Sequence, residues 1–111
     1  MVKSVSPQEA AELMRAGAAE LIDVREGHEW SAGHIDGARH APLSRLRQSP
    51  KAYLQHDKLI FVCAAGSRSK LAAQLAAALG FGEVYNLTGG TRAWTDAGFS
   101  LVAPAQQDAT G

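Results

Sequence analysis

The sequence predicts an α/β protein whose parallel sheet is covered by helices on both faces. Segments with the apolar and β-branched content of buried strands alternate with segments that carry helical patterning and helix caps. The 111 residues match the size of one domain, and a hydrophobic content of 46% is enough for a core without disulfides or a structural metal. We expect this domain to span residues 1–102.

The N-terminal part of the chain predicts a capped helix followed by a buried strand. Ser6 and Glu9 have the spacing of a capping box, and Pro7 stands at the first helical position between them. This box opens an alanine-rich helix that ends before Gly17. The next segment, residues 19–25, has the apolar content of a buried strand and ends in charged residues.

Signals are weaker between this strand and the middle of the chain. Residues 26–32 favour a short helical turn. The segment 33–42 contains two glycines and a proline, which indicates a loop with at most one extended stretch. Residues 43–48 predict a short helix that ends before Pro50.

The central strand is followed closely by the longest helix. The apolar run at 59–62 predicts the strand, and the helix extends from residue 67 or 68 to residue 79. Its leucines recur every four residues, at Leu71, Leu75 and Leu79. Its alanines would let it lie close against a sheet, and they are Ala72, Ala73, Ala76, Ala77 and Ala78. A partner-binding stripe is the alternative, but burial is favoured because amphipathic faces usually pack against the core.

The last third of the chain predicts a short strand, a turn and a final helix. Residues 84–87 form the strand, Gly89 and Gly90 form the turn, and residues 91–97 form the helix. The segment 103–111 has too little apolar surface to order itself, so we expect a flexible C-terminal tail.

Charge and cysteine content exclude several classes of protein. Basic and acidic residues number 11 each, which leaves no net field to recruit nucleic acid or an anionic membrane. No apolar run approaches the ~20 residues that span a bilayer. The N-terminus lacks the apolar segment of a signal peptide, and the single cysteine, Cys63, cannot form an intramolecular disulfide, so we expect the reducing cytoplasm. The four histidines form no metal-ligand spacing with Cys63, and we expect no metal.

The single thiol stands where the central strand gives way to the longest helix. A free cysteine at the end of an apolar strand is usually a small buried hydrophobe. Here the residues that follow favour a nucleophile, because Gly66 allows a tight backbone path and Arg68 adds a fixed positive charge. A helix start presents unpaired N–H groups that stabilise a thiolate and an anion beside it. Such a loop suits two electrophiles, sulfane sulfur and phosphorus.

The loop Cys63-Ala64-Ala65-Gly66-Ser67-Arg68-Ser69 resembles the active-site loop of the rhodaneses, the thiosulfate:cyanide sulfurtransferases. Three more segments resemble the family's motifs in the family's order, and they are Asp23-Val24-Arg25, Glu29-Trp30 with Gly33-His34-Ile35-Asp36-Gly37-Ala38, and Leu87-Thr88-Gly89-Gly90 followed by Trp94. Together the motifs cover residues from about 6 to 102. The resemblance implies a three-layer sandwich with a central parallel sheet of about five strands.

The resemblance also implies a mechanism and its participants. Cys63 would be the catalytic nucleophile, which takes up sulfane sulfur as a persulfide and passes it on in a ping-pong reaction. The substrate-binding residues would be the rest of the loop, namely Ala64, Ala65, Gly66, Ser67, Arg68 and Ser69. The expected partners are thiosulfate or a persulfide as donor and a thiol or cyanide as acceptor, with an acceptor protein as a further option. No cofactor and no metal is implied.

Two alternative functions depend on details of the loop. Phosphatases of the cell-cycle type resemble rhodaneses in fold but have five residues between cysteine and arginine, whereas four separate Cys63 from Arg68. The shorter loop disfavours a phosphatase. Ala64 and Ala65 leave Arg68 as the only charge in the loop, so we expect weak binding of doubly charged thiosulfate. This departure keeps open a second hypothesis, a sulfur-relay or protein-binding module with little activity on thiosulfate.

Five charged or aromatic residues outside the loop are interpreted as structural. Asp23 and Arg25 stand at a strand end, and we expect them to form a surface salt bridge that ties strand to loop. His34 is interpreted as a hydrogen-bonded structural histidine, since the mechanism needs no general base. Trp30 and Trp94 are expected to pack in the core or at its rim.

Overall fold

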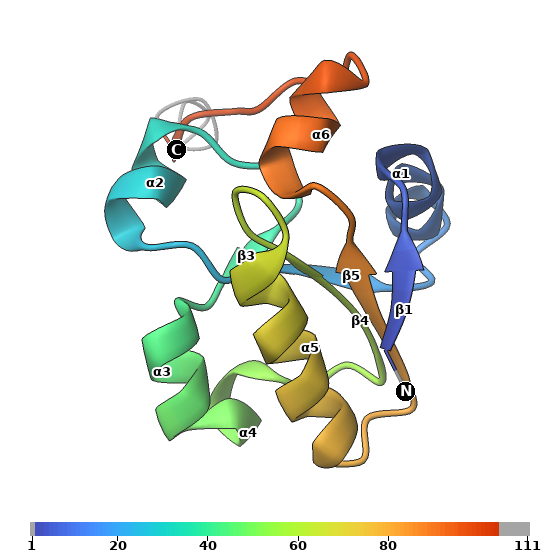
Figure 1. The fold of residues 1–111 in the computed structure, drawn as a ribbon, viewed down its shortest axis with the longest axis vertical. Coiled ribbons are helices and arrows are strands. Elements are labelled where there is room, and N and C mark those ends of the chain that lie inside the picture. Colours follow the sequence, from blue (N-terminus) through green and yellow to red (C-terminus); the bar gives the residue numbers. More distant parts are fainter. Residues whose placement is uncertain (1, 105–111) are drawn as a thin grey trace.

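A five-stranded parallel sheet forms the centre of the structure, as the sequence predicts. The computed structural model describes residues 2–104. The strands lie in the order β1-β5-β4-β2-β3, and every neighbouring pair is parallel (Figure 1). Their bounds are β1 Val2–Val5, β2 Glu20–Asp23, β3 Arg39–His40, β4 Lys58–Val62 and β5 Glu83–Leu87.

Helices cover both faces of this sheet and complete the predicted three layers. Helices α3, α4 and α5 pack on one face, and α1 and α6 pack on the other, while α2 lies at one end (Figure 1). The bounds within residues 2–104 are α1 Pro7–Arg15, α2 Gly27–Ala32, α3 Leu43–Gln48, α4 Pro50–Tyr53, α5 Ser67–Ala78 and α6 Gly90–Asp96.

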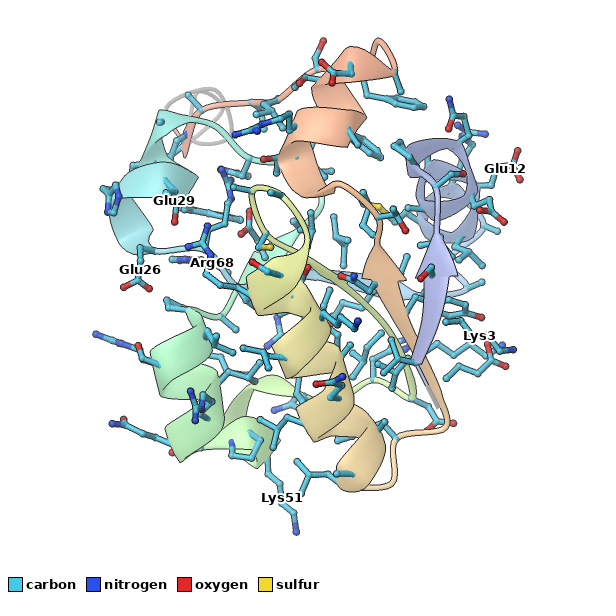
Figure 2. All side chains as sticks on the ribbon, in the orientation of Figure 1. Lys3, Glu12, Glu26, Glu29, Lys51 and Arg68 are labelled. Atoms are coloured by element: carbon cyan, nitrogen blue, oxygen red, sulfur yellow. The ribbon has the colours of Figure 1, made fainter. Side chains whose placement is uncertain are left out.

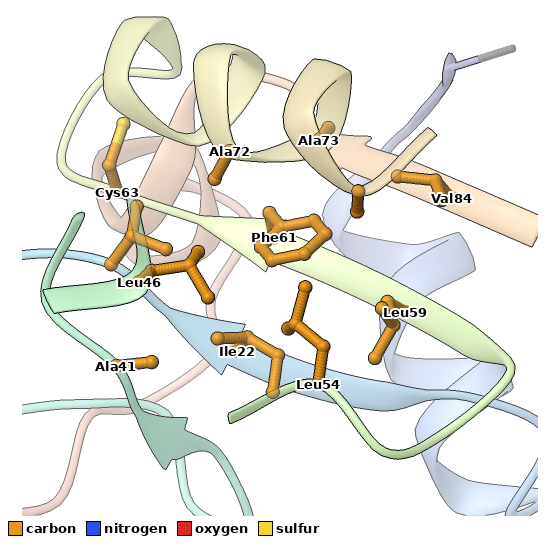
Figure 3. Close-up of a cluster of buried hydrophobic side chains, with 12 residues drawn as sticks. Ile22, Ala41, Leu46, Leu54, Leu59, Phe61, Cys63, Ala72, Ala73 and Val84 are labelled. Carbon is orange, nitrogen blue, oxygen red and sulfur yellow. The ribbon is translucent and has the colours of Figure 1, made fainter. Parts of the chain in front are cut away.

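Strand β4 shows why the sheet needs cover on both faces. Leu59 and Phe61 belong to the core cluster on the side of α5, and Ile60 and Val62 belong to the cluster on the side of α1 and α6. All four side chains are fully buried. Figure 3 shows Phe61 packed beneath α5, close to Ala72. A continuous apolar run is the pattern of a strand that is covered on both sides.

The start of α1 confirms the predicted capping box. The Ser6 hydroxyl accepts a hydrogen bond from the Glu9 backbone N–H at 3.1 Å, and the Glu9 carboxylate accepts one from the Ser6 N–H at 2.8 Å. Pro7 occupies the first helical position, where its missing N–H costs no hydrogen bond. The box stabilises an exposed helix end by satisfying two backbone donors.

Two short elements were not predicted. Strand β1 is an edge strand that pairs only with β5 among the described strands, and its middle residues, Lys3 and Ser4, are polar and exposed. Helix α4 is a single turn that starts at Pro50. Neither segment is long enough to show a hydrophobic period, so local pattern could not reveal it.

The prediction that the alanines of α5 lie against the sheet is confirmed, whereas two leucines of this segment stay at the surface. Leu71 is 55% exposed and Leu79 is 43% exposed. The helix instead presents Ala72, Ala73 and Ala76 to the sheet, and all three are fully buried. Small side chains let the helix axis approach the sheet closely, so Leu71 and Leu79 are left at the surface, while the half-buried Leu75 packs against the core cluster.

The chain beyond α6 returns to the segment that follows α2 before the described residues end. The backbones of His34 and Val102 exchange hydrogen bonds of 2.8 and 2.7 Å. The tail predicted at residues 103–111 lies, from residue 105 onward, outside the described residues, and its flexibility stays a prediction. In the described part of the chain, no helix has both the length and the apolar character needed to cross a membrane.

Candidate active site

The loop after β4 places Cys63 at the carboxyl edge of the sheet, where parallel sheets bind their ligands. Gly66 adopts φ +111°, a left-handed conformation that favours glycine, and its backbone N–H donates to the Cys63 Sγ at 3.0 Å. Helix α5 begins at the next residue, Ser67. Because Cys63 is only 1% exposed, its sulfur lies at the floor of the loop.

Helix α6 holds this loop from the opposite side. The backbone N–H groups of Thr91 and Arg92 donate to the carbonyl oxygens of Cys63 and Ala64 at 2.8 and 3.2 Å. Gly90 stands in contact with the same two peptide groups and adopts φ +64°. The first helical turn of α6 therefore binds the carbonyl groups of the loop. Figure 1 shows this turn beside the loop that precedes α5.

A buried hydrogen-bond cluster lies behind the thiol. The Ser69 hydroxyl oxygen is 3.3 Å from the Cys63 Sγ, 3.2 Å from the Gly66 carbonyl oxygen and 2.6 Å from the Asn86 Oδ1. Ser69 and Asn86 are both buried. A hydroxyl has one proton, so a bond donated to Asn86 withholds that proton from the sulfur. Asn86 thus competes with the thiolate for the Ser69 proton.

The environment of Cys63 favours the thiolate. Burial raises the pKa of the Cys63 thiol, because it removes water from the charged form. Hydrogen bonds from the Ser69 hydroxyl and from the backbone N–H groups of Ser69, Gly66 and Ala65 act in the opposite direction and lower the pKa below its ordinary value. The net effect is a larger thiolate fraction at neutral pH than a free cysteine has.

Variants of Ser69 and Asn86 are expected to shift the Cys63 pKa in opposite directions. Ser69→Ala removes a donor to the thiolate and is expected to raise the pKa of Cys63, because a hydrogen bond to the charged form is lost. Asn86→Ala removes the nearest acceptor of the Ser69 proton, which then has only the Gly66 carbonyl oxygen and the sulfur as acceptors, so the pKa of Cys63 is expected to fall. The pH profile of iodoacetamide alkylation measures both, since Cys63 is the only cysteine.

The opposite directions of the two pKa shifts distinguish competition for the Ser69 proton from a loosening of the loop. Loosening would expose the sulfur and move both alkylation profiles in the same direction, and that result would contradict the assignment. Cys63→Ser is the blank for alkylation at other side chains.

Arg68 does not point freely into the loop but forms an ion pair with Glu29 of helix α2. Its guanidinium donates to the two Glu29 carboxylate oxygens at 2.6 and 2.9 Å, and Figure 2 shows the two side chains meeting between α2 and α5. The pair lowers the pKa of Glu29 from 4.5 to about 2. A depressed pKa means that the pair is fully formed above about pH 4.5 and is lost only as the pH falls through about 2.

The predicted salt bridge between Asp23 and Arg25 is present, but its predicted surface position is wrong. The Arg25 guanidinium donates to the Asp23 carboxylate at 2.8 Å and to the Gly33 carbonyl oxygen at 2.7 Å. Both side chains are buried, with exposures of 7% for Arg25 and 0% for Asp23. The pair links the end of β2 to the segment that follows α2, so its role is to fix the frame around the site.

His34 is a structural residue, as the sequence suggests. It is fully buried, its Nδ1 lies 3.1 Å from the Trp30 carbonyl oxygen, and its ring stacks on the Trp30 indole at a centroid distance of 3.5 Å. Trp94 is buried in the core on the side of α1 and α6. Within residues 2–104, no group of three histidine, cysteine, aspartate or glutamate side chains is placed to hold a metal ion.

The remaining loop residues contribute backbone rather than side-chain chemistry. The half-buried Ala64 accepts a hydrogen bond from α6 at its carbonyl oxygen. Ala65 is exposed, and its backbone N–H donates toward the thiolate. The exposed Ser67 starts α5. The structure therefore groups the predicted binding residues around the sulfur, except that Arg68 is turned toward α2.

Sequence reasoning missed the partners that come from distant elements. Glu29 and Asn86 bind loop residues 39 and 17 positions away, and Gly90 packs on the loop from α6. One signal was available, because Asn86 is a polar residue inside an otherwise apolar strand. A buried amide needs hydrogen-bond partners, and the nearby loop supplies them.

Comparisons with known proteins agree with this geometry. The rhodanese-like domain family matches residues 6–97. Thiosulfate sulfurtransferase GlpE of Ectopseudomonas mendocina (strain ymp) is 38% identical over 92 residues, which cover 83% of this chain and 84% of that protein. The putative sulfur carrier protein YrkF of Bacillus subtilis (strain 168) is 35% identical over 75 residues, covering 68% of this chain and 40% of that protein.

A solved structure shows the same fold. The crystal structure of a rhodanese-related protein from Thermoplasma volcanium matches with a TM-score of 0.81 at 29% identity, and the match covers 90% of this chain and 97% of that one. The family match extends over most of the chain and includes both the Cys63 loop and the first turns of α6. This chain therefore belongs to the rhodanese-like domain family.

Proposed function

We propose that this protein is a sulfurtransferase that carries sulfane sulfur on Cys63. The observation that carries the proposal is the hydrogen bond of 3.0 Å from the Gly66 N–H to the Cys63 Sγ, inside a loop that lowers the pKa of this thiol. Thiolate is the nucleophilic form of cysteine, and backbone N–H groups in the same loop would stabilise the negative charge of a persulfide.

The first half-reaction loads the enzyme. The Cys63 thiolate attacks the outer sulfur of thiosulfate, a new S–S bond forms, and the S–S bond of the donor breaks. Sulfite leaves with the electron pair of that bond, and the enzyme holds an ionised persulfide. Because Cys63 is 1% exposed, the donor must reach the sulfur through the loop mouth, where Ala65 and Ser67 are the exposed residues.

The second half-reaction unloads the enzyme. The acceptor, a thiolate or cyanide, attacks the outer sulfur of the persulfide and forms a bond to it. The bond between the two sulfurs breaks, and its electron pair returns to Cys63 as thiolate. No general base is needed, since both nucleophiles react as anions, and the relative named thiosulfate sulfurtransferase supports this choice of donor.

A second candidate function is a sulfur relay in which a protein persulfide, rather than thiosulfate, loads Cys63. The specific observation in its favour is the ion pair between Arg68 and Glu29, which neutralises the only charge in the loop. A doubly charged donor such as thiosulfate gains little binding energy from an ion pair whose charges cancel. The relative named putative sulfur carrier protein is consistent with this alternative.

The mass of the intact protein tests the first proposal. Reduced protein incubated with excess thiosulfate is expected to gain one sulfur atom, and cyanide is expected to remove it. Cys63→Ser is expected to gain nothing. Absence of the gain in the wild-type protein, together with loading by an alkyl persulfide, whose outer sulfur passes to Cys63 while the alkyl thiolate leaves, would favour the relay over thiosulfate chemistry. Loading of Cys63→Ser would contradict both.

Neutralising Glu29 is expected to improve the use of thiosulfate. Glu29→Gln leaves the Arg68 charge uncompensated, and attraction between one positive charge and a dianion in a partly screened site predicts a KM for thiosulfate lower by roughly three- to tenfold. Steady-state kinetics at several thiosulfate concentrations measure this change. An alkyl persulfide donor, which carries one negative charge instead of two, should show a smaller gain.

A variant of the other partner, Arg68, tests the direction of the change in KM. Arg68→Gln leaves the Glu29 carboxylate alone beside the loop, so the KM for thiosulfate is expected to rise. The double variant should return toward the wild-type value. A rise in KM for Glu29→Gln would instead show that the pair acts only by holding the loop.

A further inference from the structure

We propose that helices α3, α4 and α5 form a docking surface for an acidic protein that exchanges sulfur with Cys63. This inference rests on the proposed function and adds the kind of partner and the place where it binds. Three observations carry it: the distribution of charge, an apolar groove within the charged surface, and the position of that groove beside the active-site loop.

Charge is segregated in this chain although its net charge is zero. Neither the segment 42–56 nor the segment 66–82 contains an aspartate or glutamate, and the two segments include α3, α4 and α5. The three helices contain five basic residues, and they are Arg45, Arg47, Lys51, Arg68 and Lys70. We call the surface of these helices the basic face.

Four of these five charges are free to meet a partner. Arg68 is neutralised by Glu29, whereas the structure shows no ion pair for the other four within residues 2–104. These four side chains are exposed, and they are Arg45, Arg47, Lys51 and Lys70. Lys70 lines a separate hollow beside β1 and β5, so Arg45, Arg47 and Lys51 carry the charge of the basic face. Figure 2 shows Lys51 extending outward from the end of α4. The basic face therefore attracts acidic surfaces locally, in a protein with no net field.

The groove between α3 and α5 is apolar and lies within the basic face. It has a volume of about 340 Å³ and is lined by Leu43, Arg47, Leu71 and Leu75. Leu71 is 55% exposed, the highest exposure of a large hydrophobic side chain among the described residues. An apolar anchor surrounded by charge is the arrangement of a protein interface, with a hydrophobic centre and a polar rim.

The groove begins one helical turn from the reactive loop. Leu71 follows Arg68 by three residues, which places it on the same side of α5 about 4.5 Å further along the axis. Arg68 is itself close enough to Cys63 for the thiolate charge to raise its pKa. A chain segment anchored at Leu71 is thus within a few residues' reach of the sulfur.

These features favour a protein over other anionic partners. A nucleic acid would gain little from the leucines. The one aromatic residue in α3, α4 and α5 is Tyr53, which packs against the core cluster and is not free to stack on bases. An acidic segment that contains an apolar residue matches both the groove and its rim. The occupant is therefore an acidic protein segment that carries the sulfur-accepting or sulfur-donating cysteine.

Two synthetic acceptor peptides test this inference. Both contain one cysteine and one leucine, and they differ in flanking the leucine with four glutamates or with four lysines. Transfer of sulfur from the loaded protein to each peptide is followed by mass spectrometry in single turnover. The glutamate peptide is expected to react about tenfold faster at low salt, and this advantage should decline as salt is added.

Matched variants locate the effect on the basic face. The double variant Arg45→Glu with Arg47→Glu is expected to abolish the advantage of the glutamate peptide. Lys3→Glu with Arg15→Glu makes the same change in net charge at exposed residues of β1 and α1, and is expected to keep the advantage. Equal rates for the two peptides, or equal loss in both double variants, would overturn the proposal.

Two leucine variants test whether the groove itself, rather than any exposed hydrophobic side chain, binds the peptide. Leu71→Gln is expected to slow transfer to the glutamate peptide several-fold, whereas Leu79→Gln, at the far end of α5, should not. An RNA oligonucleotide and phosphatidylserine vesicles are tested in parallel. Binding of either that is tighter than that of the glutamate peptide, and lost in the Arg45 and Arg47 double variant, would overturn the choice of partner.

Failure of this inference is distinguishable from failure of the proposed function. All variants are first loaded with thiosulfate and unloaded with cyanide, a reaction that requires no contact with Arg45, Arg47 or Leu71. If the wild-type protein does not load, the proposed function fails, and peptide binding is then measured by fluorescence anisotropy with cysteine replaced by serine. Preference for the glutamate peptide in that assay would still support the docking surface, and its absence would reject it.

Discussion

Gly90→Ala is expected to destabilise the protein by about 2–5 kcal/mol and to abolish loading of Cys63. A side chain at the observed φ of +64° costs about 1–2 kcal/mol, and overpacking of a filled site costs about 1–3 kcal/mol more. An added Cβ would lie on the Cys63 carbonyl oxygen and 2.5 Å from the carbonyl atoms of Ala64. The loop would have to move, and with it the N–H groups that face the sulfur. Urea denaturation measures the first effect, and intact mass after thiosulfate measures the second.

Gly98→Ala is the matched control for backbone strain alone. Gly98 has φ +95°, and nothing lies within 4 Å of the position of an added Cβ. This variant should lose only about 1–2 kcal/mol and should load normally. If the two variants were equally stable, contact between α6 and the loop would not be what Gly90 preserves.

Asp23→Ala is expected to cost about 3–5 kcal/mol of the free energy of unfolding. The substitution leaves the Arg25 charge buried with only the Gly33 carbonyl oxygen among the partners seen for its guanidinium, and an uncompensated buried charge has a penalty of this size. The loss is large against a total stability of about 5–15 kcal/mol. Thermal or urea denaturation followed by circular dichroism measures it.

A surface pair on the same strand provides the comparison. Glu20 also belongs to β2, and its salt bridge to Arg39 has side-chain exposures of 25% and 42%. Glu20→Ala should cost no more than about 1 kcal/mol, as exposed ion pairs do. The double variant Asp23→Ala with Arg25→Met should recover part of the loss, because it removes the buried charge. No recovery would mean that the strand end needs the ion pair for its geometry.

Elements of the fold that depend on local pattern could be predicted from the sequence. The capping box of α1 satisfies donors within three residues, and the apolar run of β4 shows directly that both faces are covered. The spacing of the leucines in α5 reveals a shared face but not its direction. That direction is decided by the alanines, which alone allow the helix to lie so close to the sheet.

In the candidate site, too, the local features could be predicted from the sequence and the long-range contacts could not. Cys63, Gly66 and Ser69 follow one another closely in sequence, so the loop could be recognised as a unit. The partners that tune it, Glu29 and Asn86, are brought in by helix α2 and strand β5. No local signal pairs residues so far apart, since their contact exists only after the sheet has formed.

The hydrogen bonds from α6 to the loop have a consequence for the order in which the protein becomes reactive during its synthesis. Thr91 and Arg92 leave the ribosome about 30 residues after Cys63. Until then the carbonyl groups of the loop have no α6 to bind them, and the loop lacks this support. The reactive site is therefore complete only when the last helix has folded.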